Sequence, residues 1–410
     1  MSDLFWPGDE RAGELMSGPS LLAAMVRVEA AWLSALVEAG VAPTAAKDDL
    51  ADLVDPAGPD DVEAIATGAE SGGNPVIGLV RLLRSRVEVR NPDAARWLHR
   101  GLTSQDVLDT GLVLCARDVV EVVRGELTAQ VGRLADLADE HAGTLMAGRT
   151  LTQHAVPVTF GLKCAGWLGG VLDAHDAVVA LRWPAQLGGA AGTRAAWVEL
   201  AAGLGDPRQV ADDLAVGVAD RLGLAATDPW HTSRAHVTRI GDALVGCTDA
   251  WGRIANDVLA LSRPEIGELS EGVGGGSSTM PHKANPVLST LVRRAALTAP
   301  QLGATLHLAA AESVDERADG GWHAEWAPLR DLARRTAVAA SQTTALLDGL
   351  EVHADRMRAT HDAALDDLRA EQRGMAELAG RAPAHHYLGT TSRIVEAALA
   401  RARTHLQENR

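Results

Sequence analysis

A long helical repeat constrains the fold of this 410-residue chain more than any other feature. From Val237 to Leu261, apolar residues recur at alternating steps of three and four, which is the spacing of a coiled-coil seam. A helix of about 25 residues is nearly 40 Å long at ~1.5 Å per residue, so a single small domain cannot cover it. Exposed seams of this kind favour association with further copies of the same chain.

Other segments predict further helices. A wider apolar face between Leu112 and Ala138 is typical of a helix buried among several neighbours. Asn91-Pro92 and Asp206-Pro207 each have the form of an N-cap followed by a first-turn proline. Apolar stretches predict three more helices, at 157–181, at 287–308 with Pro300 bending it, and at 329–350. We therefore predict an all-α, long-helix bundle with an N-terminal helical domain (1–110), a central bundle (111–355) and a short C-terminal helical segment (356–410).

The charge composition of the chain limits the kinds of molecule that it can bind. The chain has 38 Lys and Arg against 54 Asp and Glu, for a formal net charge of −16. Such a charge repels nucleic acid and anionic membranes, so an anionic substrate must be attracted by a local cluster of positive groups. The start of the chain lacks a basic region followed by an apolar run, and we expect a cytoplasmic protein with neither nucleic-acid nor membrane partners. Three widely spaced cysteines predict buried free thiols: Cys115, Cys164 and Cys247.

The stretch from Gly274 to Pro286 carries the strongest chemical signal. Its glycines allow close approach of the backbone to a ligand, its prolines stiffen the far side, and Lys283 and Asn285 can hold a carboxylate. We interpret it as a mobile loop that closes on an anion. An ordinary Gly/Ser surface linker is the alternative, although a linker has no need of the order Met-Pro-His-Lys-Ala-Asn-Pro.

This stretch resembles the GSSxMPxKxNP signature of the fumarase/aspartase superfamily of lyases, with every fixed position present. The resemblance implies that Ser277 is the base that removes a proton from the carbon next to a carboxylate. It also implies that Lys283 and Asn285 stabilise the resulting dianion, and it places Ser278 and Met280 among the substrate-binding residues. A free serine hydroxyl is a poor base, so Lys283 and the backbone N–H groups of the loop would have to lower its pKa.

Two further segments resemble blocks of the same superfamily. Residues 99–107 resemble the first block, which implies that the Thr103 and Ser104 hydroxyls bind a substrate carboxylate and that His99 is polar or acts in proton transfer. Residues 103–106 also have the form of a helix cap, which is the alternative. Residues 148–161 resemble the second block, which usually begins Arg-Thr-His, and here Leu151 occupies the histidine position.

The substitution at position 151 bears on the chemistry. In many members the missing imidazole protonates a leaving amine or hydroxyl, so an enzyme without it needs a leaving group that departs as an anion. The branch with an apolar residue there, followed by Gln-His, is 3-carboxy-cis,cis-muconate cycloisomerase, in which the substrate's own carboxylate leaves or adds. The segments 187–193, 229–234 and 316–326 also resemble this branch. The resemblance spans residues 1–355, and an early closing segment at 383–389 indicates a shortened C-terminal domain.

The resemblance implies interconversion of 3-carboxy-cis,cis-muconate and 4-carboxymuconolactone, with Ser277 transferring the proton. The candidates for the remaining contacts to substrate are Arg149, Gln153, His154, Arg234 and Arg317. Ordinary ion pairs are the alternative for the arginines, and structural roles for His154 and His99.

No spacing of ligand residues indicates a metal site and no glycine motif a nucleotide site, so we expect no cofactor. The superfamily resemblance implies a homotetramer whose active sites are shared by three subunits, acting on a small di- or tricarboxylate. Two alternatives stay open. One is a C–N or C–O lyase acting on a substituted succinate such as nitrosuccinate or adenylosuccinate, and the other is a non-catalytic oligomeric homologue.

Overall fold

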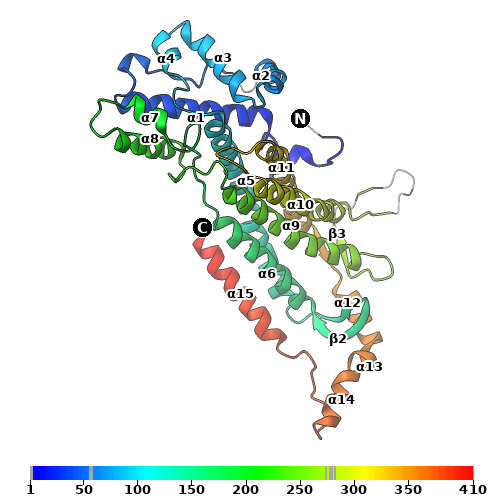
Figure 1. Cartoon of the computed structure of the whole chain (residues 1–410). Helices are drawn as coiled ribbons and strands as arrows, with labels where there is room; N and C mark the ends of the chain where they lie inside the picture. Colours follow the sequence, from blue (N-terminus) through cyan, green and yellow to red (C-terminus); the bar gives the residue numbers. More distant parts are fainter. Residues whose placement is uncertain (1–2, 55–58, 273–274, 277–279, 281–282, 410) are drawn as a thin grey trace.

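Five long helices form the body of the molecule. The computed structural model describes residues 3–54, 59–272, 275–276, 280 and 283–409. Figure 1 shows the long helices side by side in an elongated bundle, and helix-to-helix contacts connect them. They are α5 (Ser104–Glu140), α6 (Phe160–Val179), α9 (Ala235–Leu261), α10 (Val287–Ala311) and α11 (Gly321–Asp348). The predicted all-α class is confirmed.

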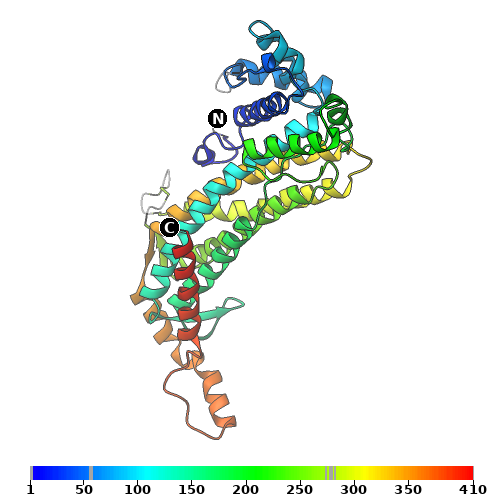
Figure 2. The ribbon, with the colours of Figure 1, turned by 90° about the vertical axis from the view of Figure 1, so that its left-hand side faces the viewer.

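The remaining helices lie at the two ends of the bundle (Figures 1 and 2). The upper end in Figure 1 holds α1 (Gly18–Glu38), α2 (Pro59–Gly72), α3 (Val76–Glu88), α4 (Pro92–Trp97), α7 (Ala195–Leu200) and α8 (Pro207–Leu222). The lower end holds α12 (Ala354–Ala363), α13 (Leu365–Leu368) and α14 (Ala370–Leu378), and α15 (Thr391–Glu408) runs back along α6. Two short 3-10 helices are also present, η1 (Asp9–Ala12) and η2 (Thr44–Ala46). By length and composition alone α1 could cross a membrane, although 61% of its apolar window is buried inside the fold.

Two antiparallel strand pairs lie beside the helices. β1 (Leu145–Thr150) pairs with β2 (Gln153–Thr159) as a hairpin, and β3 (Leu269–Glu271) pairs with β4 (Leu350–Val352). The hairpin occupies residues 157–159, so the helix predicted at 157–181 begins only at Phe160. Thr159 caps that helix by accepting a hydrogen bond from the Leu162 N–H at 3.1 Å.

The seam of α9 is buried within this one chain. Its central members Leu244, Cys247 and Trp251 are each 0% exposed, and the Trp251 indole donates to Gln130 Oε1 on α5 at 2.7 Å. The predicted helix is therefore confirmed, but the expectation that its seam is left for another copy of the chain is wrong, because α10, α11 and α6 cover it. Exposed apolar residues lie instead on α10, where Leu297 and Leu308 are 61% and 68% exposed.

Local signals for helix ends are confirmed. Asn91 accepts a hydrogen bond from the Ala94 N–H at 3.0 Å, and Asp206 accepts one from the Arg208 N–H at 3.0 Å. The predicted helix at 287–308 corresponds to α10, and that at 329–350 begins earlier, as α11, with Pro328 inside it. The predicted domain boundary at 110 falls within the first turns of α5. All three cysteines are free and buried, as predicted.

One glycine in α6 fixes how closely it approaches the end of α5. A Cβ at Gly161 would lie 2.6 Å from Ala142 Cα and 2.7 Å from the Ala138 carbonyl oxygen, both of which are backbone atoms. We expect Gly161→Ala to lower the free energy of unfolding by about 1–3 kcal/mol. Gly125→Ala in α5, where a Cβ meets nothing within 4 Å, should raise it by about 0.5–1 kcal/mol. Denaturant unfolding of both variants checks this, and equal effects would contradict it.

A buried histidine pair holds α15 against α6. The rings of His175 and His405 lie 4.1 Å apart at 88°, with exposed fractions of 3% and 6%. Burial, followed by the charge of His405, lowers the pKa of His175 to about 4, and burial also lowers the pKa of His405. Asp176 opposes both shifts, Glu408 opposes that of His405, and Arg124 and Arg401 contribute positive charge.

This pair predicts acid sensitivity. Between pH 6.5 and about 4 the unfolded chain binds protons that the folded chain does not, so stability falls as the pH falls through that window. We expect the melting temperature to drop from pH 7.5 to 5, and to drop less when both histidines are replaced by Phe. His307→Gln is the control, because His307 is exposed on α10 beside Asp242. Identical pH profiles for wild type and the double variant would contradict the assignment.

Candidate active site

The first sequence block forms a tight turn before α5. His99 has a left-handed backbone (φ 62°), and its Nδ1 lies 2.6 Å from Oε1 of Glu29, which is 0% exposed on α1. A carboxylate at Nδ1 fixes that nitrogen as the donor and directs Nε2 away from Glu29. Trp32 and Trp197 hold the same turn, because their indole N–H groups donate to the Arg100 and Gly101 carbonyls, each at 2.8 Å.

Thr103 both caps α5 and contacts an arginine from far along the chain. Thr103 and Asp106 form a capping box, with the Thr103 N–H donating to Asp106 Oδ2 at 3.0 Å. Arg317, which lies just before α11, donates to the Thr103 hydroxyl. The helix cap, which was the alternative for residues 103–106, is present, and the structure brings the candidates Thr103 and Arg317 together.

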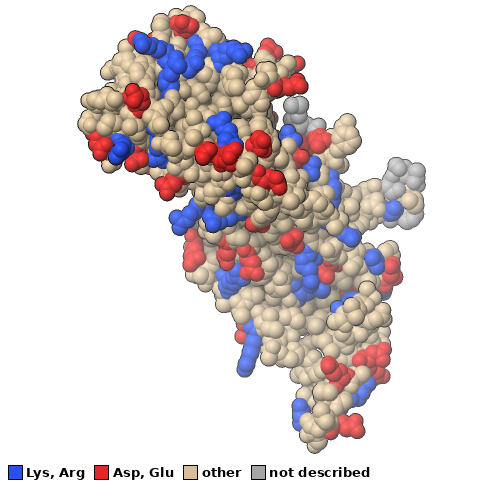
Figure 3. Space-filling view, viewed as in Figure 1, with Lys and Arg blue, Asp and Glu red and all other residues tan. Residues whose placement is uncertain are grey.

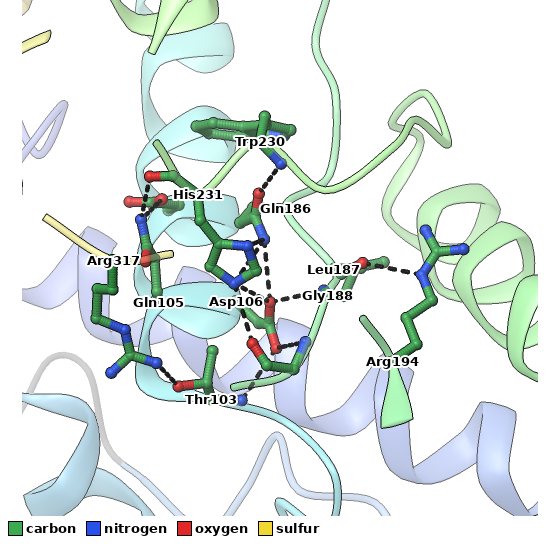
Figure 4. Close-up of polar contacts among 12 residues, drawn as sticks. Thr103, Gln105, Asp106, Gln186, Leu187, Gly188, Arg194, Trp230, His231 and Arg317 are labelled. Carbon is green, nitrogen blue, oxygen red and sulfur yellow. Dashed lines mark hydrogen bonds and ion pairs between the residues drawn. The ribbon is translucent and has the colours of Figure 1, made fainter. Parts of the chain in front are cut away.

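Asp106 joins this turn to a second loop (Figure 4). Its carboxylate is fully buried and accepts hydrogen bonds from the backbone N–H groups of Gly188 and Gly189 at 2.9 and 3.0 Å, and from Gln186 Nε2 at 3.2 Å. Burial raises the pKa of Asp106 to about 6, and the N–H donors act in the opposite direction. The loop therefore supplies the donors that a buried carboxylate needs.

Glycine is required at that contact. A Cβ at Gly188 would lie 2.5 Å from His231 Cε1 and 2.7 Å from Pro229 Cβ, and Gly189 has a φ of +72°. His231 Nε2 lies 3.0 Å from the Gly189 carbonyl, and burial lowers the pKa of His231, so a neutral ring donates there. This explains the Leu-Gly-Gly sequence of the loop in physical terms.

A cavity of about 380 Å³ opens beside the same turn. The side of α3 and the turn before α5 contribute its lining residues, which are Ile77, Val80, Arg81, Arg84, His99 and Ser104. Its polar groups are cationic or hydroxylic, and its remaining wall is apolar. Such a surface suits an anion with a hydrocarbon part.

Arg234 does not face this cavity. Its guanidinium makes hydrogen bonds to Asp109, Glu325 and the His231 carbonyl that together use all five of its N–H donors. Its side chain is 2% exposed. This geometry corrects the expectation that Arg234 binds a substrate carboxylate, because no donor is left for one.

The second block forms the β1–β2 hairpin, which projects from the side of the bundle in Figure 2. The turn residues Leu151 and Thr152 both have positive φ, at 47° and 69°, as a two-residue type I′ turn requires. Leu151 is 95% exposed, and Gln153 and His154 are also exposed. The predicted residues of this block therefore lie at a strained, outward-facing tip.

Arg149 anchors the hairpin to Glu268, which lies shortly before the stretch 274–286, the third block. Its guanidinium forms two hydrogen bonds, at 2.8 and 3.0 Å, with the carboxylate of Glu268, which is 0% exposed and precedes β3. An ion pair was the alternative to substrate binding for Arg149, and the structure shows that pair.

The third block is held at its base. Gly275 and Asn285 form an antiparallel bridge through hydrogen bonds of 2.8 and 2.9 Å, and Glu271 accepts from the Leu288 and Ser289 N–H groups at the start of α10. Lys283 and Met280 are exposed and Asn285 is half-buried. Ser277 and Ser278 lie outside the described residues.

Among the described residues of one chain, the first block lies at the opposite end of the bundle from the other two. α5 has 37 residues and is therefore about 55 Å long, with Thr103 at its first end and the hairpin following its last. The third block follows α9, whose 27 residues span about 40 Å from the turn that holds Arg234. One chain therefore presents the pieces of a site at opposite ends of its bundle.

Similarity to known proteins identifies the family of this chain. A family model described as a lyase matches residues 19–300. A nitrosuccinate lyase from Streptomyces davaonensis is 43% identical over 355 residues, 85% of this chain and 74% of that protein. A 3-carboxy-cis,cis-muconate cycloisomerase from Pseudomonas aeruginosa is 38% identical over 381 residues, 89% of this chain and 79% of that protein. The solved 3-carboxy-cis,cis-muconate lactonizing enzyme from Pseudomonas putida has a TM-score of 0.82 at 30% identity, over 96% of this chain and 97% of that one.

The chain belongs to the fumarase/aspartase superfamily of lyases. It is accordingly an enzyme of the lyase and cycloisomerase type, as the resemblance implied. Sequence reasoning missed three supporting residues: Glu29, Glu268 and Glu271. Each forms a hydrogen bond that holds one of the three blocks in place, although none belongs to a block. No local signal marks them. Glu29 and Glu268 lie 70 and 119 residues from their partners.

The position of Arg234 predicts a structural rather than a substrate-binding phenotype. Arg234→Met leaves two carboxylates buried without a cation, so we expect a loss of about 3–5 kcal/mol in the free energy of unfolding. Arg253→Met is the control in the same helix, because its ion pair with Asp257 is on the surface and should change stability by less than about 1 kcal/mol. Unchanged stability of Arg234→Met together with a raised KM would restore the substrate-binding role.

Proposed function

We propose that this lyase-superfamily member is a 3-carboxy-cis,cis-muconate cycloisomerase, interconverting that tricarboxylate with 4-carboxymuconolactone in the cytoplasm. The proposal is supported by Leu151, at the position where many relatives carry an acid-base histidine, together with the likeness of the whole fold to a solved lactonizing enzyme, with a TM-score of 0.82 over 96% of this chain. An aliphatic side chain cannot protonate a leaving group, which favours a reaction that releases a group stable as an anion. The carboxylate that leaves when the lactone opens is such a group.

The reaction is an internal addition in which the tricarboxylate takes up one proton and becomes a lactone with two carboxylates. One carboxylate oxygen of the substrate forms a C–O bond to an alkene carbon, and the alkene electrons move toward the carboxylate conjugated with it. Ser277 then gives a proton to the adjacent carbon and regains one from solvent, and in lactone opening the serinate takes the proton from that carbon and releases it to solvent. Holding both ends of the flexible acid in place is worth about 7–11 kcal/mol of the barrier.

Charged and hydroxyl groups stabilise the developing dianion in this proposal. Thr103 and Ser104 at the start of α5 bind one carboxylate, and Arg317 is positioned by its contact with Thr103. Lys283 and Asn285 from the third block stabilise the charge on the carboxylate conjugated with the reacting bond. His99 and His154 remain the candidates for orienting a carboxylate or moving a proton.

We propose that these groups meet in a homotetramer with shared sites. The separation of about 55 Å along α5 supports this, because one chain cannot bring Thr103 and the hairpin to a single small substrate. The outward-facing hairpin tip supports it as well, since exposed Leu151 has no packing partner of its own.

Nitrosuccinate elimination is the second candidate. The 43% identity to a nitrosuccinate lyase favours it, and nitrite also departs as a stable anion, so Leu151 is equally compatible with it. The two reactions differ in charge, because nitrosuccinate carries two carboxylates and the muconate carries three.

A substrate panel tests both candidates. Purified protein is given 3-carboxy-cis,cis-muconate, nitrosuccinate and adenylosuccinate without added cofactor. We expect loss of the absorbance of the conjugated muconate with lactone as the product, and neither nitrite nor fumarate from the succinates. Nitrite and fumarate release with no muconate turnover would establish the second candidate instead.

Substitution of the serine tests the mechanism. We expect Ser277→Ala to lower kcat by about 10²–10⁴-fold with little change in melting temperature, because a general acid-base group contributes on that scale. The control is Ser270→Ala, since Ser270 lies on β3 at the base of the same segment and bonds to Glu351 and His353. Turnover of no acid by either form would identify a non-catalytic homologue.

A further inference from the structure

The cavity beside α5 holds arginines that have no counterion. Ile77, Val80, Arg81 and Arg84 recur at helical spacing, so they lie along one side of α3. Arg81 makes no ion pair or hydrogen bond with any described residue. This is unusual in a chain whose formal charge is −16, where acidic partners are plentiful. Figure 3 shows basic side chains gathered over the end of the molecule that carries α3 and α4.

Arg84 lies about one turn after Arg81 on α3, and its guanidinium is partly desolvated. It donates from Nη2 to the Leu98 carbonyl at 2.7 Å, while its Nε is buried with no hydrogen-bond partner among the described residues. Desolvation, followed by the charge of Arg100, lowers the pKa of Arg84. A bound anion would offset both unfavourable effects.

The opposite wall of the cavity belongs to the proposed active site. His99 and Ser104 line it, and Ser104 is the first residue of α5, whose N-terminal N–H groups favour negative charge. Arg84 lies close to this wall, because it donates to the Leu98 carbonyl, and Ile77 and Val80 add apolar surface to the same cavity. A ligand that fills the cavity therefore meets hydroxyl and imidazole groups, apolar side chains and two guanidinium groups.

We propose that Arg81, supported by Arg84, binds a substrate carboxylate that takes no part in bond making, and that this contact selects tricarboxylates over dicarboxylates. This inference rests on the proposed function for the identity of the natural substrate. The charge balance of the proposed mechanism supports it: there Thr103, Ser104 and Lys283 serve the carboxylate at the reacting end, and Arg317, which donates to Thr103, serves a further one. The two arginines of α3 then serve a third carboxylate, which a substituted succinate lacks.

The first experiment measures ligand binding without turnover. Propane-1,2,3-tricarboxylate and glutarate share a three-carbon chain and differ by one carboxylate, so calorimetric titration of both isolates its contribution. We expect wild type to bind the tricarboxylate about 10–100-fold more tightly, since hydrogen bonds to charged groups contribute on that scale. Arg81→Gln should abolish this preference and change glutarate binding less than about 3-fold. Arg81→Lys should retain part of it, because it keeps the charge and loses the planar fork.

A matched control separates contact from long-range charge. Arg100→Gln removes the same charge near the cavity, but Arg100 does not line it. We expect it to weaken both ligands to a similar, small extent that disappears at high salt. Arg81 is exposed, so all variants should keep the wild-type melting temperature.

The second experiment uses the substrate. Arg81→Gln should raise KM for 3-carboxy-cis,cis-muconate about 10–100-fold, with kcat changed far less. If wild type turns over no muconate and yet Arg81 governs the tricarboxylate preference, the proposed function fails and this inference stands. If muconate is turned over and Arg81→Gln changes neither KM nor the binding preference, or weakens both ligands equally, the inference fails and the proposed function stands.

Discussion

The buried ion cluster around Arg234 is the interaction on which the arrangement of the long helices depends. Arg234 lies at the start of α9 and bonds to Asp109 of α5 and Glu325 of α11, and Trp322 donates to Asp109 at 2.8 Å. Isolated charges at these depths would be prohibitively costly, so each is tolerable only while the other helices supply its partners. Burial raises the pKa of Glu325, and the charge of Arg234 and its hydrogen bonds to Glu325 oppose that shift. The register of three helices is thereby fixed, and with it the approach of Arg317 to Thr103.

Much of the scaffold could be predicted from the sequence because its determinants are local. The caps at Asn91 and Asp206 and the repeat in α9 depend on residues a few positions apart, and all three are confirmed. The β1–β2 hairpin could not be predicted in this way. Its turn is Leu151-Thr152, without the Gly, Asn or Asp that normally marks positive φ, so apolar periodicity extended the following helix into strand residues.

In the candidate site, too, local motifs could be recognised from the sequence whereas long-range contacts could not. Motifs located the three blocks, and the structure shows that two of the candidates, Thr103 and Arg317, are in contact, which no motif predicted. The motif gave Arg234 and Arg149 equal standing as candidates, but the distinction between a substrate ligand and an internal ion pair depends on partners far along the chain. Arg234 meets Asp109 across 125 residues, and Arg149 meets Glu268 across 119. Pairing at such distances is decided by packing, which periodicity does not encode.

The distribution of paired and unpaired arginines has a common electrostatic explanation. In the proposed mechanism no acid at position 151 protonates the leaving group, so positive charge holds the anion that departs and the dianion that forms. In a chain with a net charge of −16 this requires cations that are kept away from internal carboxylates. Arg149 and Arg234 are satisfied by Glu268, Asp109 and Glu325, whereas Arg81, Arg84 and Arg317 have no carboxylate partner among the described residues. The strained hairpin tip fits the same logic, because left-handed backbone at two non-glycine residues costs about 1–3 kcal/mol each and persists where the surrounding structure determines it. Position 151 is thus presented outward as an apolar group, and in the proposed mechanism the arginines without carboxylate partners at the other end of the bundle add positive charge to that of Lys283.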